Sequence, residues 1–117
     1  MLPLMYRDFE TYQSPYFFKR FKDRKTQIGY THHFDLLKDF LESFKEPSKS
    51  VLMKDVREGI RYCDTFCIFK NSAGIYITIT LKETGGYFEV VNVLPSNLWQ
   101  KEIFDNKDDI RKEIKRI

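Results

Sequence analysis

The chain has 117 residues, of which 42% are hydrophobic and 16% aromatic, so we expect a single folded domain, 1–117, and exclude a disordered chain. Twenty basic and 17 acidic residues give a net charge of +3, a smaller excess than strongly basic nucleic-acid binders carry. No apolar stretch is long enough to cross a bilayer, and charged residues interrupt the N-terminal segment too early for a signal peptide. We therefore expect a cytoplasmic protein with no membrane partner.

The N-terminal part of the chain, residues 1–47, has the pattern of helices. Ser14 followed by a proline is a typical start, because serine caps a helix and proline fits its first position. Gly29 interrupts the pattern, and Thr31 is predicted to cap a second helix over 32–45. This second helix is predicted because apolar residues recur at helical spacing: Leu36, Leu37, Phe40, Leu41 and Phe44.

Residues 50–95 have the pattern of an antiparallel sheet. Four segments joined by short loops, two of them glycine-bearing, are predicted as strands: SVLMKD, GIRYCDTFCIFK, GIYITITLK and YFEVVNVL. Residues 96–117 are predicted to be helical, with Ser96 or Asn97 as the cap. The fold class is therefore α+β, with N-terminal helices and a C-terminal helix packed on one face of a four-stranded antiparallel sheet.

The two cysteines, Cys63 and Cys67, stand four residues apart in a predicted strand. This spacing places both thiols on one face, about 13 Å apart along the strand, which is too far for a disulfide. We interpret them as reduced buried thiols in a cytosolic setting. A zinc site that joins them to His32 and His33 lacks a supporting ligand spacing, and we predict no metal and no cofactor.

Three groups of residues are candidates for chemistry. His33 opens the second predicted helix, where the helix dipole disfavours its cation and leaves a neutral imidazole that can accept a proton; packing beside the core is the structural alternative. Arg61 lies just inside the second predicted strand, where a guanidinium can hold a phosphate through two hydrogen bonds. The third strand offers hydroxyls and a cation on one face, from Tyr76, Thr78, Thr80 and Lys82. The structural alternative is a face that is simply exposed to solvent.

Metal-independent cleavage of RNA requires these types of side chain. The 2′-OH of the substrate is the nucleophile, a base takes its proton, an acid protonates the leaving 5′-oxygen, and a cation stabilises the charged phosphorus centre. The predicted catalytic residues are His33, Arg61, Thr80 and Ser96. The predicted RNA-binding residues are His32, Lys54, Arg57, Tyr76 and Lys82. The basic segment FFKRFKDRK, residues 17–25, adds phosphate contacts and stacking rings, or else its phenylalanines belong to the core.

The order of these features has a counterpart in a known family. A histidine opens a helix, D-x-R-x-x-x-R-Y follows at 55–62, a strand carries Thr80, and Y-x-x-V-x-x-x-x-P-S-N closes the pattern at 87–97. This layout, over about residues 30–97, resembles the small nucleases of the barnase–EndoU–colicin–RelE (BECR) superfamily, in particular toxin modules of phage and contact-dependent inhibition systems. The resemblance implies metal-independent cleavage of RNA, often transfer or messenger RNA, across the exposed face of the sheet. It also implies a cognate antitoxin or immunity protein as a partner.

Two other interpretations stay open. A non-catalytic interaction protein, such as an immunity protein, an antitoxin or a phage-encoded inhibitor, uses a surface of the same aromatic and charged character. Immunity proteins against nucleases tend to be acidic, so the net charge of +3 argues mildly against that class. A small-ligand or nucleotide-binding domain would use the Tyr76, Thr78 and Thr80 face as a pocket floor, and nothing in the sequence specifies its ligand.

Overall fold

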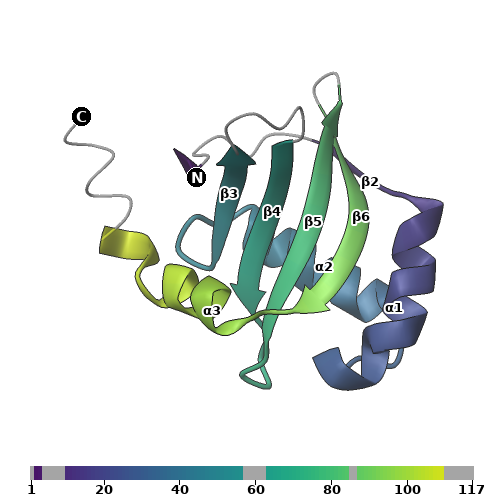
Figure 1. Ribbon diagram of the computed structural model, residues 1–117. Coiled ribbons are helices and arrows are strands. Elements are labelled where there is room, and N and C mark those ends of the chain that lie inside the picture. The colour runs from purple at the N-terminus through teal and green to yellow at the C-terminus, as the bar shows by residue number, and fades with distance from the viewer. Residues whose placement is uncertain (1, 4–9, 57–62, 85–86, 110–117) are drawn as a thin grey trace.

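The computed structural model describes residues 2–3, 10–56, 63–84 and 87–109 (Figure 1). The α+β fold class is confirmed. In chain order the elements are β1 (Leu2–Pro3), β2 (Glu10–Gln13), α1 (Pro15–Ile28), α2 (His33–Phe44), β3 (Ser50–Val56), β4 (Cys63–Lys70), β5 (Tyr76–Thr84), β6 (Tyr87–Pro95) and α3 (Leu98–Asp105).

One sheet contains all six described strands, in the order β1-β3-β4-β5-β6-β2. Its four central strands are the four predicted segments, and each pairs antiparallel with the next. The prediction that residues 1–47 are helical is wrong for β1 and β2, which form the two edges of the sheet. β1 pairs with β3, and β2 pairs in parallel with β6. The β2 sequence ETYQ contains two good strand formers but is too short to show a strand period.

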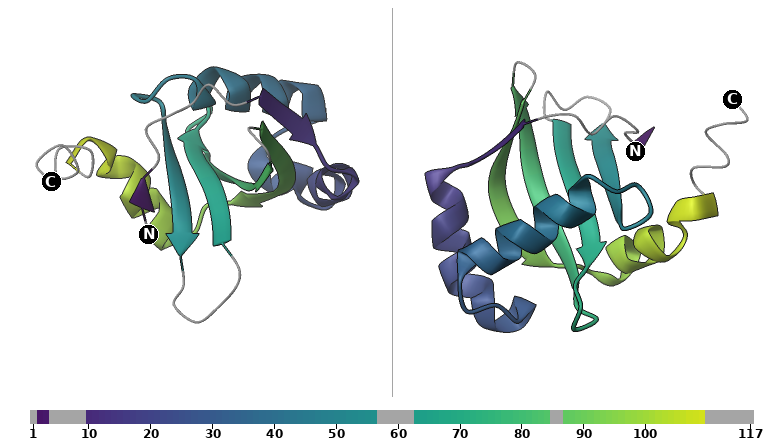
Figure 2. Two further views of the ribbon diagram at one scale, coloured as in Figure 1. Left: turned by 90° about the horizontal axis from the view of Figure 1, so that it is seen from above. Right: turned by 180° about the vertical axis from the view of Figure 1, so that it is seen from behind.

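The helices lie on both faces of the sheet, which corrects the prediction of a single covered face. α1 and α2 cover one face, and α3 lies on the other (Figures 1 and 2). The main core lies between α1, α2 and the sheet, and it includes Phe17, Phe40, Phe69 and Ile79. A second cluster lies under α3 and consists of Val51, Met53, Phe66, Ile68 and Phe104. We call this side of the sheet the α3 face.

The reason for two covered faces is visible in β3 and β4. Both strands contain uninterrupted apolar runs, VLM in β3 and FCIF in β4. A strand with such a run is apolar on both faces, since successive side chains point to opposite sides. The N-terminal helices can cover only one of these sides, so the other requires a separate element. α3 supplies it through Phe104 and the half-buried Ile103.

The helix ends follow local capping chemistry. Ser14 caps α1 as predicted, and its hydroxyl accepts a 3.2 Å hydrogen bond from the Tyr16 N–H. Asn97 caps α3 in a reciprocal capping box with Gln100. The prediction that Thr31 caps α2 is wrong by one residue: His32 occupies the cap with extended backbone, and its side chain makes no capping hydrogen bond.

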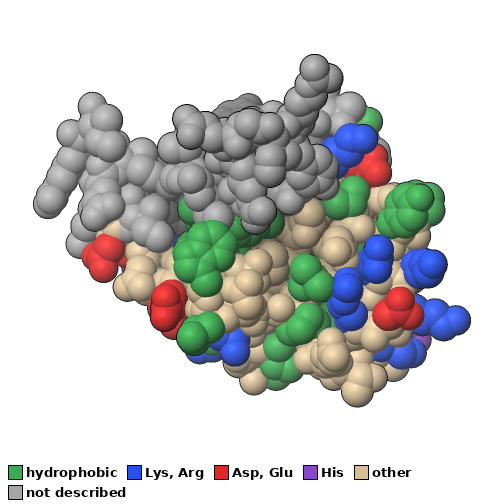
Figure 3. All heavy atoms as spheres, viewed as in Figure 1, with side chains coloured by type: hydrophobic (Ala, Val, Ile, Leu, Met, Phe, Trp, Pro, Cys, Tyr) green, Lys and Arg blue, Asp and Glu red, His purple; other side chains and the backbone are tan. Residues whose placement is uncertain are grey.

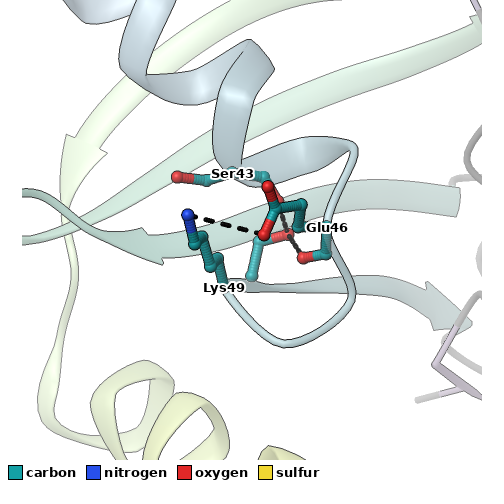
Figure 4. A network of polar contacts seen from close by, with 4 residues as sticks. Ser43, Glu46 and Lys49 are labelled. Carbon is teal, nitrogen blue, oxygen red and sulfur yellow. Dashed lines mark hydrogen bonds and ion pairs between the residues drawn. The ribbon is translucent and has the colours of Figure 1, made fainter.

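A short turn connects α2 to β3 (Figure 4). The fully buried Ser50 donates its hydroxyl to the carbonyl oxygen of Ser43 at 2.5 Å, which joins the end of the helix to the first residue of the strand. The Glu46–Lys49 ion pair, at 3.4 Å, spans the same turn. Both of its side chains are exposed, so we expect it to contribute less than about 1 kcal/mol.

Candidate functional site

Two of the predicted catalytic residues, His33 and Thr80, lie on opposite sides of the sheet. His33 is in the helical layer, where its ring contacts Phe18 edge-on, with 4.9 Å between ring centroids, and Phe21 at 6.1 Å. Thr80 lies on the α3 face, because it alternates with Ile79 and Leu81, which belong to the main core. The described residues therefore do not form one centre that joins His33 to Thr80, since the sheet separates them.

The remaining predicted residues are partly outside the described part of the chain. Arg61 and Arg57 lie outside the described residues, as does the side chain of Lys54. His32 is exposed at the start of α2. Of the two cysteines, Cys67 is buried in the main core, while the side chain of Cys63 lies outside the described part of the chain.

The predicted residues Ser96 and Tyr76 attach α3 to the sheet. The Ser96 and Thr78 hydroxyl oxygens are 2.8 Å apart in a buried hydrogen bond, and Thr78 also donates to Gln100 Oε1 at 3.0 Å. The Tyr76 hydroxyl donates to Asp105 at 2.8 Å, and its ring packs edge-on against Phe104. These contacts satisfy the polar groups of Ser96 and Tyr76 within the fold, and α3 covers the part of the face that holds Tyr76 and Thr78.

The predicted residues Thr80 and Lys82 lie on the same face with two residues that the sequence analysis missed. Thr80 pairs with Asn92 across the β5–β6 ladder, and Lys82 pairs with Glu89. Side chains of directly opposed residues share a face, with Cβ atoms about 5 Å apart. Lys82 is exposed, and the other three side chains are half-buried. We call these four residues the β5–β6 site.

A β-bulge makes this arrangement possible. Asn92 pairs with Thr80, but the next residue of β5, Leu81, pairs with Val90, so Val91 is left over. Without this extra residue Glu89 and Asn92 would point to opposite faces, because they are three positions apart. Bulges re-aim side chains in this way and are frequent beside active sites. Nothing in the sequence YFEVVNVL marks the bulge, which explains why both residues were missed.

A pocket adjoins the β5–β6 site at the place where β2 passes into α1. It has a volume of about 390 Å³ and is lined by Gln13, Ser14, Pro15, Tyr87 and Glu89. Tyr87 and Glu89 flank the core residue Phe88 in β6, so they point to the α3 face. Glu89 therefore belongs both to the lining of the pocket and to the β5–β6 site.

Arg24 brings a guanidinium from α1 to the same edge of the sheet. Its Nη1 donates to Asn92 Oδ1 at 2.6 Å and to the Val93 carbonyl oxygen at 3.0 Å. Figure 3 shows this side of the molecule with Lys and Arg side chains gathered over α1 at the right. The β5–β6 site thus combines one carboxylate, one ammonium, one hydroxyl and one amide, with a guanidinium bonded to the amide.

Within the described ranges, no group of three or more His, Cys, Asp and Glu side chains is arranged to hold a metal ion. None of the helices in those ranges combines the length and the apolar character that crossing a membrane requires. Comparisons of this chain with protein-family models, with curated proteins and with solved structures find no match.

Proposed function

We propose that this chain is a metal-independent ribonuclease that cleaves RNA by 2′-OH transesterification at the β5–β6 site. The observation that carries the proposal is the pairing of Lys82 with Glu89 beside the pairing of Thr80 with Asn92. These pairs place a proton acceptor, a cation and hydrogen-bonding groups side by side on one face, next to a pocket. Thr80 and Lys82 belong to the predicted set, whereas Glu89 replaces His33 as the base.

The proposed reaction uses side chains alone. The Glu89 carboxylate takes the proton of the 2′-OH, and the 2′-oxygen attacks phosphorus. The bond from phosphorus to the 5′-oxygen breaks, and the Lys82 ammonium gives a proton to that oxygen. Thr80 and Asn92 hold the non-bridging oxygens, and the Arg24 charge offsets the negative charge that develops there. The products are a 2′,3′-cyclic phosphate and a 5′-hydroxyl.

The test is cleavage of a fluorescent single-stranded RNA by the purified protein and by Glu89→Gln. The substitution keeps the shape of the side chain but removes the base, so we expect the rate to fall about 100-fold or more. Glu42→Gln is the matched control, because Glu42 is exposed on α2 in the helical layer. A 2′-O-methyl version of the same oligonucleotide should not be cut at all. Equal rates for wild type and Glu89→Gln would refute the assignment.

In the cell, such a ribonuclease belongs to a toxin and immunity or phage system, with a cognate antitoxin or immunity protein as its partner. This part of the proposal rests on the resemblance of the sequence to BECR nucleases. Expression under tight control without a partner should therefore arrest growth and fragment RNA, and transfer RNA is the first species to examine. The Glu89→Gln variant should be tolerated under the same conditions.

A second candidate function is a non-catalytic interaction protein, such as an immunity protein, an antitoxin or a phage-encoded inhibitor. The observation that favours it is the pair Leu98 and Trp99 at the start of α3, which are 73% and 51% exposed. Exposed tryptophan is typical of protein interfaces. Harmless expression, intact RNA and a folded protein would favour this candidate over the ribonuclease.

A further inference from the structure

We infer that a second surface of this protein, formed by α1 and the start of α2, binds single-stranded RNA beyond the nucleotides held at the β5–β6 site. This α1–α2 surface consists of Phe18, Lys22, Lys25, His33 and Phe34. The inference takes RNA as the ligand from the proposed function. The argument for the surface itself depends on rings and charges that the proposed reaction does not use.

Three rings lie together at the surface. Phe34 is 73% exposed and Phe18 is 41% exposed. His33 lies between them, with its centroid 4.9 Å from that of Phe18 and 4.3 Å from that of Phe34. Single exposed apolar residues are common on protein surfaces, whereas a contiguous group marks a binding site. The buried Phe17 and Phe21 lie beneath Phe18 and His33 and support them from the core.

The charge around these rings is strongly positive. α1 contains five basic residues and one acidic residue, Asp23. Lys22 and Lys25 follow Phe18 at intervals of four and seven residues, so they lie on the same stripe of the helix. Within the described part of the chain, no acidic side chain lies at ion-pair distance from the basic residues of α1. The charges of Lys22 and Lys25, both exposed, are therefore available to an external anion.

Exposed aromatic rings beside free cations are the features with which proteins bind single-stranded nucleic acid, since bases stack on the rings and cations follow the backbone. A membrane surface fits less well, because the apolar stripe of α1, formed by Phe17, Phe21 and Ile28, is already buried in the core. An RNA ligand also fits the location. α1 runs beside β6 (Figure 1), and Arg24 from the same helix contacts Asn92 in the β5–β6 site.

The test is the affinity of the full chain for a 12-nucleotide 2′-O-methyl RNA, measured by fluorescence anisotropy. This oligonucleotide has no free 2′-OH and cannot be cleaved, so binding is measured whether or not the chain is a nuclease. Phe34→Ala should weaken binding about 5- to 100-fold, the range that the loss of one stacked base gives, and Phe34→Trp should keep it. Lys22→Gln should lower the salt dependence of the affinity by about 0.7 in slope.

Leu98→Ala is the matched control for Phe34→Ala, since Leu98 is equally exposed, at 73%, but lies on α3. Its affinity for the oligonucleotide should equal that of wild type. Equal affinities of Phe34→Ala and wild type would overturn the inference even if RNA is cleaved. The inference would also be overturned if the chain did not bind the oligonucleotide but bound anionic vesicles or an acidic peptide through Phe34. Binding that depends on Phe34 without any cleavage would support it while the ribonuclease proposal fails.

Discussion

Arg24 and Asn92 form the contact that joins the helical layer to the edge of the β5–β6 site. β2 covers the edge of β6 only as far as the pair Gln13↔Val90, after which the chain turns into α1. Arg24 Nη1 then donates to Asn92 Oδ1 at 2.6 Å and to the Val93 carbonyl oxygen at 3.0 Å. A side chain of the helix therefore satisfies strand groups that lie beyond the end of β2.

Replacing Arg24 by alanine should lower the free energy of unfolding by about 2 kcal/mol, because two hydrogen bonds from a charged donor are lost. Urea denaturation of both proteins measures this difference. Arg20→Ala is the control, since Arg20 is exposed on the same helix, and its effect should stay within about 0.5 kcal/mol. Similar losses in the two variants would show that the contact with Asn92 contributes little.

Gly29 ends α1 in a conformation that other residues avoid. Its φ is +77°, and a Cβ added there would lie 2.8 Å from Ile75 Cδ1. Gly29→Ala should therefore destabilise the protein by about 2 kcal/mol or more, from backbone strain and from the steric conflict with Ile75. The midpoint of urea unfolding reports this loss.

Ile75→Val separates the two causes, because valine has no Cδ1. In the Ile75→Val background, Gly29→Ala should cost only the backbone part, about 1–2 kcal/mol. A cost that is unchanged by Ile75→Val would mean that strain at Gly29 explains the whole effect and that the contact with Ile75 relaxes freely.

Tyr30 makes the stability of the protein depend on pH in the alkaline range. Burial, and with it a 2.6 Å hydrogen bond to Asp39, raises the pKa of the Tyr30 hydroxyl above its ordinary value of 10.0. Above pH 10 the unfolded state loses this proton while the folded state keeps it. Stability from this group is therefore complete below pH 10 and is lost as the pH rises through the folded pKa.

Tyr30→Phe should be less stable than wild type by about 1 kcal/mol at neutral pH, since the hydrogen bond to Asp39 is lost. The difference should shrink as the pH rises above 10, because phenylalanine has no proton to lose. Chemical denaturation at a series of pH values tests this, with Tyr16→Phe as the control, since Tyr16 is 69% exposed. A constant difference across the series would contradict the pKa assignment.

The helices and central strands could be predicted from the sequence, because each has a period or a cap that is local. The Ser14 start, the α2 stripe and the alternation of β5 are of this kind. Which face of the sheet each helix covers could not be predicted in the same way. Whether α3 packs on the same face as α1 and α2 depends on the apolar character of both faces of β3 and β4, which is a property of runs such as FCIF and not of a period or a cap.

The candidate site was harder to predict, because it depends on pairing between strands. Thr80 and Lys82 follow from the alternation of β5 alone. Glu89 and Asn92 reach the same face only through the bulge at Val91, and Arg24 reaches it only because β2 ends at Gln13. His33 was grouped with Thr80 by residue type, and only the three-dimensional structure shows that the sheet separates them.

Thr78 and Thr80 offer a matched pair, because they lie two residues apart on one strand and one face. Thr78 is 2% exposed and contacts both Ser96 and Gln100. Since its one proton is donated to Gln100 Oε1, the Ser96 hydroxyl is the donor in the 2.8 Å contact. Thr80 is half-buried, and its side chain has no hydrogen-bond partner within the described ranges.

Valine replaces threonine with little change of shape, so the two variants separate structure from chemistry. Thr78→Val leaves the buried Ser96 donor without its acceptor, and should lower the free energy of unfolding by about 1–3 kcal/mol. Thr80→Val should change stability by less than about 0.5 kcal/mol but slow RNA cleavage, because Thr80 is proposed to hold the phosphate. Denaturation and cleavage assays on both variants test this. Slower cleavage by Thr78→Val at full stability, with Thr80→Val unaffected, would move the site under α3.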